Sequence, residues 1–242
     1  MRLLLSALFL VVAVPALAET ALVAVATNFR PVVEALSESF EAATGHRIEV
    51  SAAATGKLAA QISAGAPFDV FLAADEATPE RLVAAGFADG ASRFTYAVGQ
   101  LVLWSADPEL DLGDPAAALR AARHVAIANP EIAPYGKAAM QSIAFMRLSD
   151  ISDKLVTGEN IGQAYALVAS RAAELGFVAG SAVTDGTGAG WTVPADHHDP
   201  IRQDAVLLTH GEGNRAATAF LDYLRSDAAA AVIARFGYTT TP

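Results

Sequence analysis

The sequence predicts an α/β protein made of two lobes. Segments typical of strands and of helices alternate along the chain, a pattern that indicates parallel sheets covered by helices. Two long β-rich runs, "FTYAVGQLVLWS" at 94–105 and "QDAVLLTH" at 203–210, interrupt this alternation, and it restarts between them. The simplest topology consistent with all three observations is two α/β lobes joined by two extended crossovers.

The first lobe is predicted to begin with three strand–helix units. The expected strands cover 20–27, 46–53 and 68–75, and the expected helices cover 28–45, 56–65 and 78–86. Thr78 is a suitable N-cap for the third helix, Pro79 a suitable first residue and Gly86 a suitable stop.

The second lobe repeats the pattern between the two crossovers. Strands are expected at 124–129, 154–160 and 175–183, and helices at 134–146 and 161–174. Helices at 213–225 and 227–236 then return the chain to the first lobe. We therefore assign residues 19–97 and 206–242 to the first lobe and 98–205 to the second. Two lobes with two connections imply a hinge and a ligand cleft between them.

The N-terminus has the pattern of a cleavable signal peptide over residues 1–18. Arg2 precedes an apolar run, and "PALA" at 15–18 is a small-residue cleavage site. The alternative, an N-terminal membrane anchor, lacks a flanking stop-transfer pattern. No cysteine follows the run, which excludes a lipoprotein. We expect an exported, soluble, periplasmic chain that begins near Glu19.

Composition narrows the possible functions. The chain has 242 residues, of which 53% are hydrophobic, and 26 acidic side chains against 16 basic ones give a net charge of −10. Nucleic acid and anionic membranes are therefore not expected partners. The sequence contains no cysteine, which rules out thiolate metal sites, iron–sulfur clusters, disulfides and a cysteine nucleophile.

Candidate ligand contacts lie where strands end and helices begin, which is where open α/β sheets bind ligands. Helix starts expose unpaired N–H groups and partial positive charge, so several of them aimed at one point bind an anion. Four junctions combine small, hydroxyl, amide or glycine residues with no acid on the first turn: Thr27-Asn28, Thr55-Gly56, Tyr135-Gly136 and Asn160-Ile161-Gly162.

A structural interpretation of these residues remains open. Thr27, Asn28 or Thr55 could be ordinary N-caps, and Tyr135 could be an interface tyrosine. Their distribution favours a ligand site, because two junctions fall in each lobe, as a cleft between the lobes requires.

Several motifs carry a resemblance over essentially the whole mature chain. They are "ATNF" at 26–29, "QISAGAPFDVFLAADE" at 61–76, "SRFTYAVGQLVLWS" at 92–105, "ANPEIAPYGKAA" at 128–139, "NIGQA" at 160–164 and "GFVA" at 176–179. In these the chain resembles the periplasmic molybdate-binding proteins that deliver oxyanion to an ABC transporter, in the branch with ATNF and APYG motifs. The resemblance implies a type II periplasmic-binding-protein fold with a tetrahedral oxyanion held between the lobes by neutral donors.

The resemblance also implies which residues bind the ligand. Thr27, Asn28 and Thr55 would contribute from the first lobe through side chain and backbone. Tyr135 and the backbone N–H of Ile161 would contribute from the second. Some members of the family carry a ligand tyrosine where this chain has Ala179, and that role is not carried over.

The absence of an acid at the four junctions predicts selectivity. A protonated anion such as hydrogen phosphate needs an acceptor, so a site made of donors prefers a fully deprotonated dianion. Molybdate, tungstate, sulfate and chromate all qualify as such dianions, so the size of the cavity must separate them. Lys57 and Lys137 follow turn glycines and could add positive potential at the cleft mouth or be ordinary surface lysines.

Other sequence features point less specifically to function. The run "ADHHDP" at 195–200 contains adjacent acids and histidines without the spacing of a metal site. "GTGAG" at 186–190 lacks the following helix of a dinucleotide loop. We therefore expect a monomeric, non-catalytic receptor without a cofactor that serves the permease and ATPase of an ABC importer. The alternatives are a receptor for another oxyanion such as sulfate, or an iron-binding protein or exported enzyme on the same fold.

Overall fold

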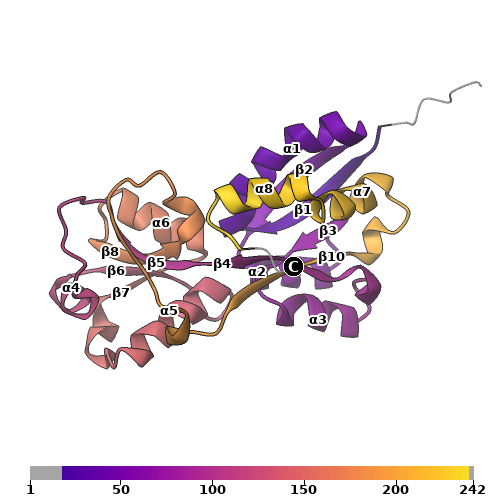
Figure 1. Ribbon diagram of the computed structural model, residues 1–242. Helices are drawn as coiled ribbons and strands as arrows, with labels where there is room; N and C mark the ends of the chain where they lie inside the picture. Colours follow the sequence, from indigo (N-terminus) through magenta and orange to yellow (C-terminus); the bar gives the residue numbers. More distant parts are fainter. Residues whose placement is uncertain (1–17, 240–242) are drawn as a thin grey trace, which may run out of the picture.

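The computed structural model describes residues 18–239 and shows two lobes, each built on a five-stranded sheet (Figure 1). Apart from Ala18, the predicted signal peptide lies outside the described residues. Within residues 18–239, no helix has the length and apolar character needed to cross a membrane.

The first sheet has the strand order β2-β1-β3-β10-β4. β1 is parallel to β2 and β3, whereas β10 runs antiparallel to both β3 and β4. The strands are β1 Thr20–Ala26, β2 Arg47–Ala53, β3 Val70–Leu72, β4 Phe94–Gly99 and β10 Ile201–Leu207.

The second sheet repeats this arrangement with the order β7-β6-β8-β5-β9. β6 is parallel to β7 and β8, and β5 is antiparallel to β8 and β9. The strands are β5 Leu101–Ser105, β6 Val125–Ala128, β7 Leu155–Gly158, β8 Leu175–Ala179 and β9 Ala189–Thr192. Each lobe therefore places the carboxyl ends of three parallel strands at one edge.

The first β-rich run of the sequence divides between the two sheets. β4 belongs to the first sheet and β5 to the second, and Gln100 alone separates them. The chain returns to the first sheet through β10. The lobe limits expected at 98 and 205 thus fall inside β4 and β10.

Helices cover both faces of the first sheet. Val23 and Val25 of β1 pack with α1, α7 and α8, and Ala24 packs with α2 and α3 on the opposite face, as the two-residue period of a strand requires. The helical segments of this lobe are η1 Thr27–Phe29, α1 Arg30–Thr44, α2 Thr55–Ser63, α3 Ala77–Ala84, α7 Arg215–Leu224 and α8 Asp227–Arg235.

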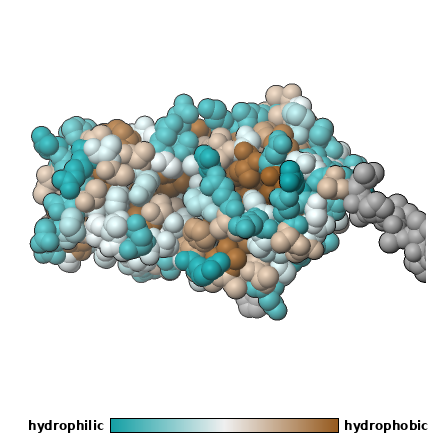
Figure 2. Space-filling model, turned by 90° about the horizontal axis from the view of Figure 1, so that it is seen from above, coloured by the Kyte–Doolittle hydropathy of each residue, from teal (hydrophilic) through white to brown (hydrophobic). Residues whose placement is uncertain are grey.

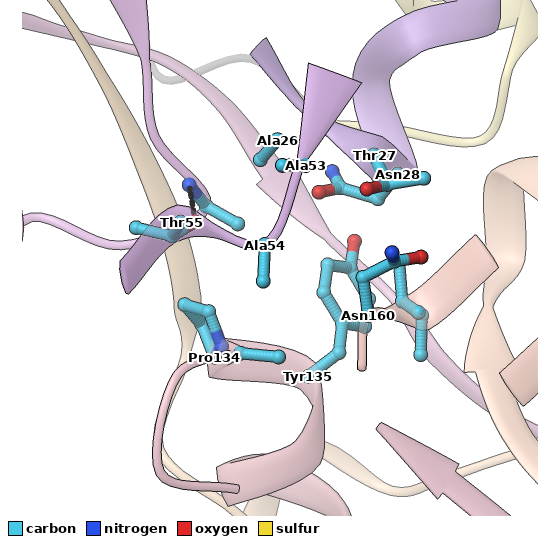
Figure 3. A pocket seen from close by; sticks show the side chains of 12 residues that line it. Ala26, Thr27, Asn28, Ala53, Ala54, Thr55, Pro134, Tyr135 and Asn160 are labelled. Carbon is cyan, nitrogen blue, oxygen red and sulfur yellow. Dashed lines mark hydrogen bonds between the residues drawn. The ribbon is translucent and has the colours of Figure 1, made fainter. Parts of the chain in front are cut away.

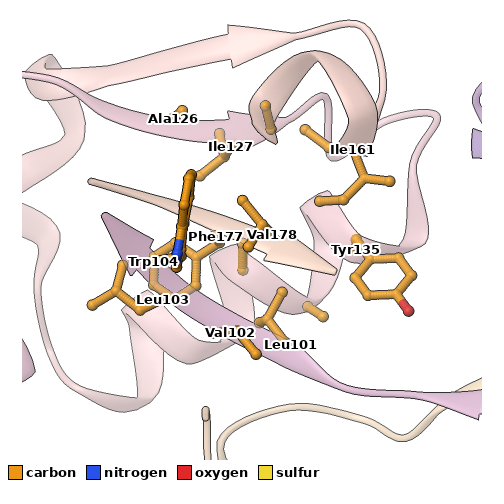
Figure 4. Packing of buried hydrophobic residues seen from close by; sticks show 14 of the residues in the cluster. Leu101, Val102, Leu103, Trp104, Ala126, Ile127, Tyr135, Ile161, Phe177 and Val178 are labelled. Atoms are coloured by element: carbon orange, nitrogen blue, oxygen red, sulfur yellow. The ribbon is translucent and has the colours of Figure 1, made fainter. Parts of the chain in front are cut away.

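The second lobe has its own apolar core (Figure 4), in which Trp104 stacks on Tyr165 at 5.2 Å between ring centroids. Its helices are α4 Pro115–Ala121, α5 Pro134–Phe145 and α6 Ile161–Ala169. Neither α4 nor β9 was expected from the sequence. Short 3-10 turns occur at η2 Gly90–Ser92, η3 Ser149–Lys154, η4 Gly180–Ala182, η5 Ala195–His197 and η6 Thr209–Gly211.

The predicted start of α3 is wrong, whereas its predicted stop is correct. The helix begins at Ala77, so Thr78 lies inside it and Pro79 is its third residue. The N-cap position is Glu76, without a side-chain cap, and the Asp75 carboxylate accepts the first-turn N–H of Thr78 at 2.7 Å. Gly86 follows the helix with φ +80°, a conformation that glycine adopts readily.

On the face shown in Figure 2, hydrophobic side chains form separate patches among hydrophilic ones. Scattered apolar surface of this kind is normal for a globular protein.

Candidate functional site

A small pocket lies between the lobes at the carboxyl ends of β1, β2 and β3 and the starts of η1, α2, α5 and α6 (Figure 3). Its cavity volume of ≈ 10 Å³ excludes a nucleotide or a sugar from this closed arrangement. All five predicted ligand residues are among those that line it: Ala26, Thr27, Asn28, Ala53, Ala54, Thr55, Ala74, Ala133, Pro134, Tyr135, Asn160 and Ile161.

In three of the helical segments that face the pocket, the residue just before the segment, its N-cap position, is an alanine. Ala26, Ala54 and Ala133 are the N-caps of η1, α2 and α5, and none of these starts has a side-chain cap. Away from the pocket, side chains do cap helices, as Asp114, Asn214 and Ser226 cap α4, α7 and α8. The interpretation of Thr27, Asn28 and Thr55 as N-caps is therefore wrong. Because the first N–H groups of a helix lack the partners of later turns, these starts can present donors to the pocket, although the Gly56 N–H already donates to Ile132 O and the Gly136 N–H to Ala133 O.

The first turns of these segments carry no acid, as the sequence predicted. None of the residues that line the pocket is charged. Any charge stabilisation inside the pocket must therefore come from hydrogen-bond donors and helix dipoles.

The Thr27 hydroxyl is buried without a hydrogen-bond partner. Within the part of the chain that the structure describes, Thr27 Oγ1 is the one buried side-chain nitrogen or oxygen in this condition. Buried polar atoms are nearly always paired in folded proteins, so an orphan requires an explanation. A ligand acceptor in the pocket that Thr27 lines would provide that partner.

The Thr55 hydroxyl is oriented by the backbone. Thr55 is only 1% exposed, and its Oγ1 accepts the Ala74 N–H at 3.0 Å (Figure 3). A hydroxyl has one hydrogen to give, and no group in residues 18–239 accepts it. Thr55 is thus arranged to donate into the pocket.

The Tyr135 hydroxyl leaves the core of the second lobe and points toward the Thr27–Asn28 turn (Figures 3 and 4). Its oxygen accepts from Gln203 Nε2 at 3.2 Å. Burial, followed by the neighbouring Tyr238, raises the pKa of Tyr135 well above its ordinary value. The phenol therefore stays protonated at neutral pH and can act as a donor.

The Asn28 side chain is already engaged inside the protein. Its Nδ2 donates to Gln203 Oε1 at 2.8 Å and to Tyr238 Oη at 3.0 Å, which uses both amide hydrogens. We expected Asn28 to donate from both its side chain and its backbone. In this arrangement only its backbone N–H, at the start of η1, is left for a ligand.

Ile161 contributes a backbone position at the start of α6. The preceding residue, Asn160, is an N-cap, because its Oδ1 accepts the Gln163 N–H at 3.0 Å. The side chain of Ile161 packs in the second-lobe core. Its amide lies on the first turn of the helix and lines the pocket from the second lobe.

Direct contacts hold the two lobes together around the pocket. The Gly56 N–H donates to Ile132 O at 2.9 Å, and Ser181 Oγ donates to Asn28 O at 3.0 Å. A Cβ at Gly162 would lie 2.6 Å from Thr27 Cγ2, so only glycine permits this approach. The structure therefore represents a closed arrangement of the lobes.

The two lysines considered at the cleft mouth do not line the pocket. Lys57 Nζ lies 3.3 Å from Glu159 of the other lobe, and Lys137 Nζ lies 3.9 Å from Asp199. All four side chains are at least half exposed, so solvent screens these pairs. Lys57 connects the lobes at the surface and leaves the interior to neutral donors.

The alternative features of the sequence have structural explanations. His197 stacks on Phe145 at 4.1 Å between ring centroids, and Asp199 Oδ2 accepts from Gln141 Nε2 at 2.7 Å. Across residues 18–239, no group of three or more acidic or histidine side chains could hold a metal ion. The 186–190 glycine run leads into strand β9, so no helix follows it.

Sequence reasoning missed the buried polar residues behind the pocket. Gln203, Tyr96 and Tyr238 are 0%, 3% and 4% exposed and connect to Asn28 and Tyr135. The sequence does contain an indication of this network, because a glutamine begins the second β-rich run. An amide is rarely placed in a buried strand without a hydrogen-bond partner.

Two α/β lobes that close on a small pocket of donors define a solute-binding protein. The family model described as bacterial extracellular solute-binding protein matches residues 21–239, and the chain belongs to this family. The family model and the curated relatives alike describe binding proteins.

Individual relatives make the similarity more specific. The chain is 50% identical over 223 residues to the molybdate-binding protein ModA of Azotobacter vinelandii, covering 89% of this chain and 88% of the relative. It is 44% identical over 237 residues to the protein of the same name from Rhodobacter capsulatus, covering 97% and 94%. The solved Azotobacter vinelandii periplasmic molybdate-binding protein superposes with a TM-score of 0.87 and 39% identity, covering 92% of this chain and all of that one. The predicted periplasmic-binding-protein fold is confirmed.

Proposed function

We propose that this chain is the extracytoplasmic molybdate receptor of an ABC importer and that it also takes tungstate. The observation that carries the proposal is the pocket itself, whose lining combines uncapped helix starts with the hydroxyls of Thr27, Thr55 and Tyr135 and contains no charged side chain. The relatives named as molybdate-binding proteins support the choice of ligand.

In the proposed complex, one tetrahedral oxyanion contacts both lobes. Thr27, Thr55 and the backbone of Asn28 donate from the first lobe, and Tyr135 and the backbone N–H of Ile161 donate from the second. Because the ligand bridges the lobes, it stabilises the closed arrangement, and the importer's permease can recognise that arrangement.

The donor arrangement argues for a fully deprotonated dianion. Thr55 Oγ1 and Tyr135 Oη already accept from Ala74 and Gln203, so among the pocket hydroxyls only Thr27 Oγ1, which the dianion uses as a donor, is left to accept the O–H of hydrogen phosphate. An unpaired buried donor costs about 1–3 kcal/mol. Sulfate has the charge of molybdate, and the size of the closed pocket would separate the two.

The same geometry disfavours the iron-binding alternative. Ferric iron is best held by anionic oxygen ligands, yet Tyr135 is the one tyrosine lining the pocket and its pKa is raised. An exported enzyme would require a base next to the ligand, and no titratable residue other than Tyr135 lines the pocket.

The cellular setting follows from the proposed role. Residues 1–18 would direct export and be removed, and the mature chain would act in the periplasm as a monomer. Its partners would be the permease and ATPase of the importer, with no nucleic acid and no resident cofactor.

Removing single donors tests the placement of the ligand. Thr55→Ala and Tyr135→Phe should each weaken molybdate binding by about 1–3 kcal/mol, because each removes one oriented hydroxyl. Isothermal titration calorimetry of the two variants measures the effect. Unchanged affinity in both would show that the anion binds elsewhere.

A further inference from the structure

We propose that Gln203 is a positioning residue that makes Tyr135 a donor to the bound anion, an inference that rests on the proposed function. Gln203 lines no part of the pocket, but it is fully buried on β10 directly behind it. Its amide connects donor residues of both lobes.

The hydrogen bonds of Gln203 run in a defined direction. Oε1 accepts from Asn28 Nδ2 at 2.8 Å, and Nε2 donates to Tyr135 Oη at 3.2 Å. Because Nε2 occupies the acceptor side of the Tyr135 oxygen, Tyr135 cannot give its hydrogen to Gln203. The hydrogen is then left for Tyr238, whose hydrogen bond helps to raise the pKa of Tyr135, or for an anion in the pocket that competes with Tyr238.

A third group supports this orientation of the amide. Tyr96 Oη lies 3.1 Å from Gln203 Oε1 and 3.0 Å from Ala73 O, and its hydroxyl can donate to either. The carbonyl end of Gln203 thus faces two groups able to donate, Asn28 and Tyr96. The amide nitrogen is left for Tyr135.

The backbone around Gln203 is shaped to hold the contact. The pairing of β10 with β4 shifts between Gln203 and Asp204, and such irregularities redirect side chains in a strand. On β4, a Cβ at Gly99 would meet Tyr135 Oη and lie 2.7 Å from Gln203 Nε2. Glycine at this crossover therefore makes room for an amide–phenol pair that spans the lobes.

The role can be tested by changing the amide without touching the pocket. Gln203→Met removes the donor to Tyr135 while keeping similar length, and we expect molybdate affinity to fall by about tenfold. In a Tyr135→Phe background, the same change should cost less than about threefold, because the hydroxyl to be positioned is gone. Calorimetry on the four proteins of this double-mutant cycle gives both values.

Gln203→Glu provides a second, independent variant. A carboxylate can only accept, so it would take the Tyr135 hydrogen, and it also repels the dianion; affinity should fall further than in Gln203→Met, and the part of the loss that disappears in a Tyr135→Phe background measures the positioning role. This variant also decides the matter if Gln203→Met does not fold. Gln141→Met, which removes an amide that contacts Asp199 outside the pocket, is the matched control and should bind normally.

The outcomes separate this inference from the proposed function. Wild-type protein that binds molybdate, together with losses from Gln203→Met that are equal in both backgrounds, would overturn the positioning role alone. Full affinity in Gln203→Glu would do the same. Wild-type protein that does not bind molybdate would overturn both.

Discussion

Two threonines supply hydroxyls to the pocket in different ways. Thr55 has its acceptor side occupied by the Ala74 N–H, whereas Thr27 Oγ1 has no partner within residues 18–239. Leaving a buried hydroxyl unpaired costs about 1–3 kcal/mol in the ligand-free protein. At Thr27, part of the anion's affinity would therefore come from relieving this cost.

Thr27→Val should separate binding from stability. Valine keeps the shape that fits beside Gly162 and removes the unpaired hydroxyl, so molybdate affinity should fall by about 1–3 kcal/mol. The free energy of unfolding of the ligand-free protein should stay equal or rise slightly. Calorimetry and urea unfolding measure the two quantities.

Thr95→Val is the matched control. Thr95 Oγ1 donates to Asp204 at 2.7 Å outside the pocket, so this change should lower stability and leave affinity unchanged. The prediction for Thr27 fails if Thr27→Val unfolds more easily and still binds normally.

Binding should be insensitive to pH near neutrality. The pKa of Tyr135 is raised by burial, and no other titratable side chain lines the pocket. The dissociation constant for molybdate should therefore be constant between about pH 7 and pH 9, which lies below the ordinary tyrosine pKa of about 10. A tenfold change across that range in calorimetry would reveal an ionising group at the ligand.

The buried tyrosines should make stability depend on pH at the alkaline end. Burial raises the pKa of Tyr96, Tyr135 and Tyr238, so these phenols stay protonated in the folded chain while those of the unfolded chain ionise. The folded state then holds more protons, and stability falls as pH rises above the unfolded value of about 10.

At the level of elements, the absence of caps is what prepares the site. η1, α2 and α5 follow Ala26, Ala54 and Ala133, whose side chains cannot cap the first N–H groups. A cap residue contributes about 0.5–2 kcal/mol to a helix. η1, α2 and α5 lack that contribution. Their first-turn N–H groups that have no partner inside the protein can donate to the ligand instead.

Adding a cap at one of these starts should therefore lower molybdate affinity without lowering the stability of the ligand-free protein. In Ala54→Asp, the carboxylate can accept the Lys57 N–H and place a negative charge in the pocket. We expect the ligand-free protein to keep its stability to within about 1 kcal/mol. Molybdate affinity should drop by about a hundredfold or more through like-charge repulsion.

The neutral variant Ala54→Asn separates the two causes. It can cap α2 without adding charge, so its loss of affinity should be smaller. If Ala54→Asp bound molybdate normally in calorimetry, the start of α2 would not be part of the anion site.

The sequence was sufficient to predict the two-lobed architecture but not which sheet each strand joins or where each helix begins. Strand–helix alternation and the two β-rich runs were sufficient for two lobes with two crossovers, because hydrophobic periodicity is a local property. The division of 94–105 between two sheets depends on contacts with β10 and β8, which no local pattern reveals. α3 illustrates the same limit, because the helix begins before Thr78 and Asp75 accepts the Thr78 N–H.

The sequence predicted which residues line the site, but not which atoms of those residues are free to bind a ligand. Thr27, Asn28, Thr55, Tyr135 and Ile161 all line one pocket. The direction of each hydrogen bond depends on residues distant in sequence. Gln203, 68 residues from Tyr135 and 175 from Asn28, determines how both side chains are used.

At the scale of the whole molecule, the two lobes meet through direct contacts around a pocket without charged lining residues. The chain carries a net charge of −10, yet dianion binding is compatible with it, because distant surface charges are screened beyond about 10 Å and helix starts act locally. The ligand is therefore expected to complete the interface between the lobes.

A panel of ligands tests this central claim most directly. Purified protein spanning residues 19–242 is titrated by calorimetry, and its melting temperature is followed, with molybdate, tungstate, sulfate, phosphate and ferric iron. We predict saturable binding of one molybdate or tungstate per chain, with stabilisation that grows as RT ln(1 + [L]/Kd), and no effect of phosphate or iron. Stabilisation by phosphate or iron without stabilisation by molybdate would contradict the account.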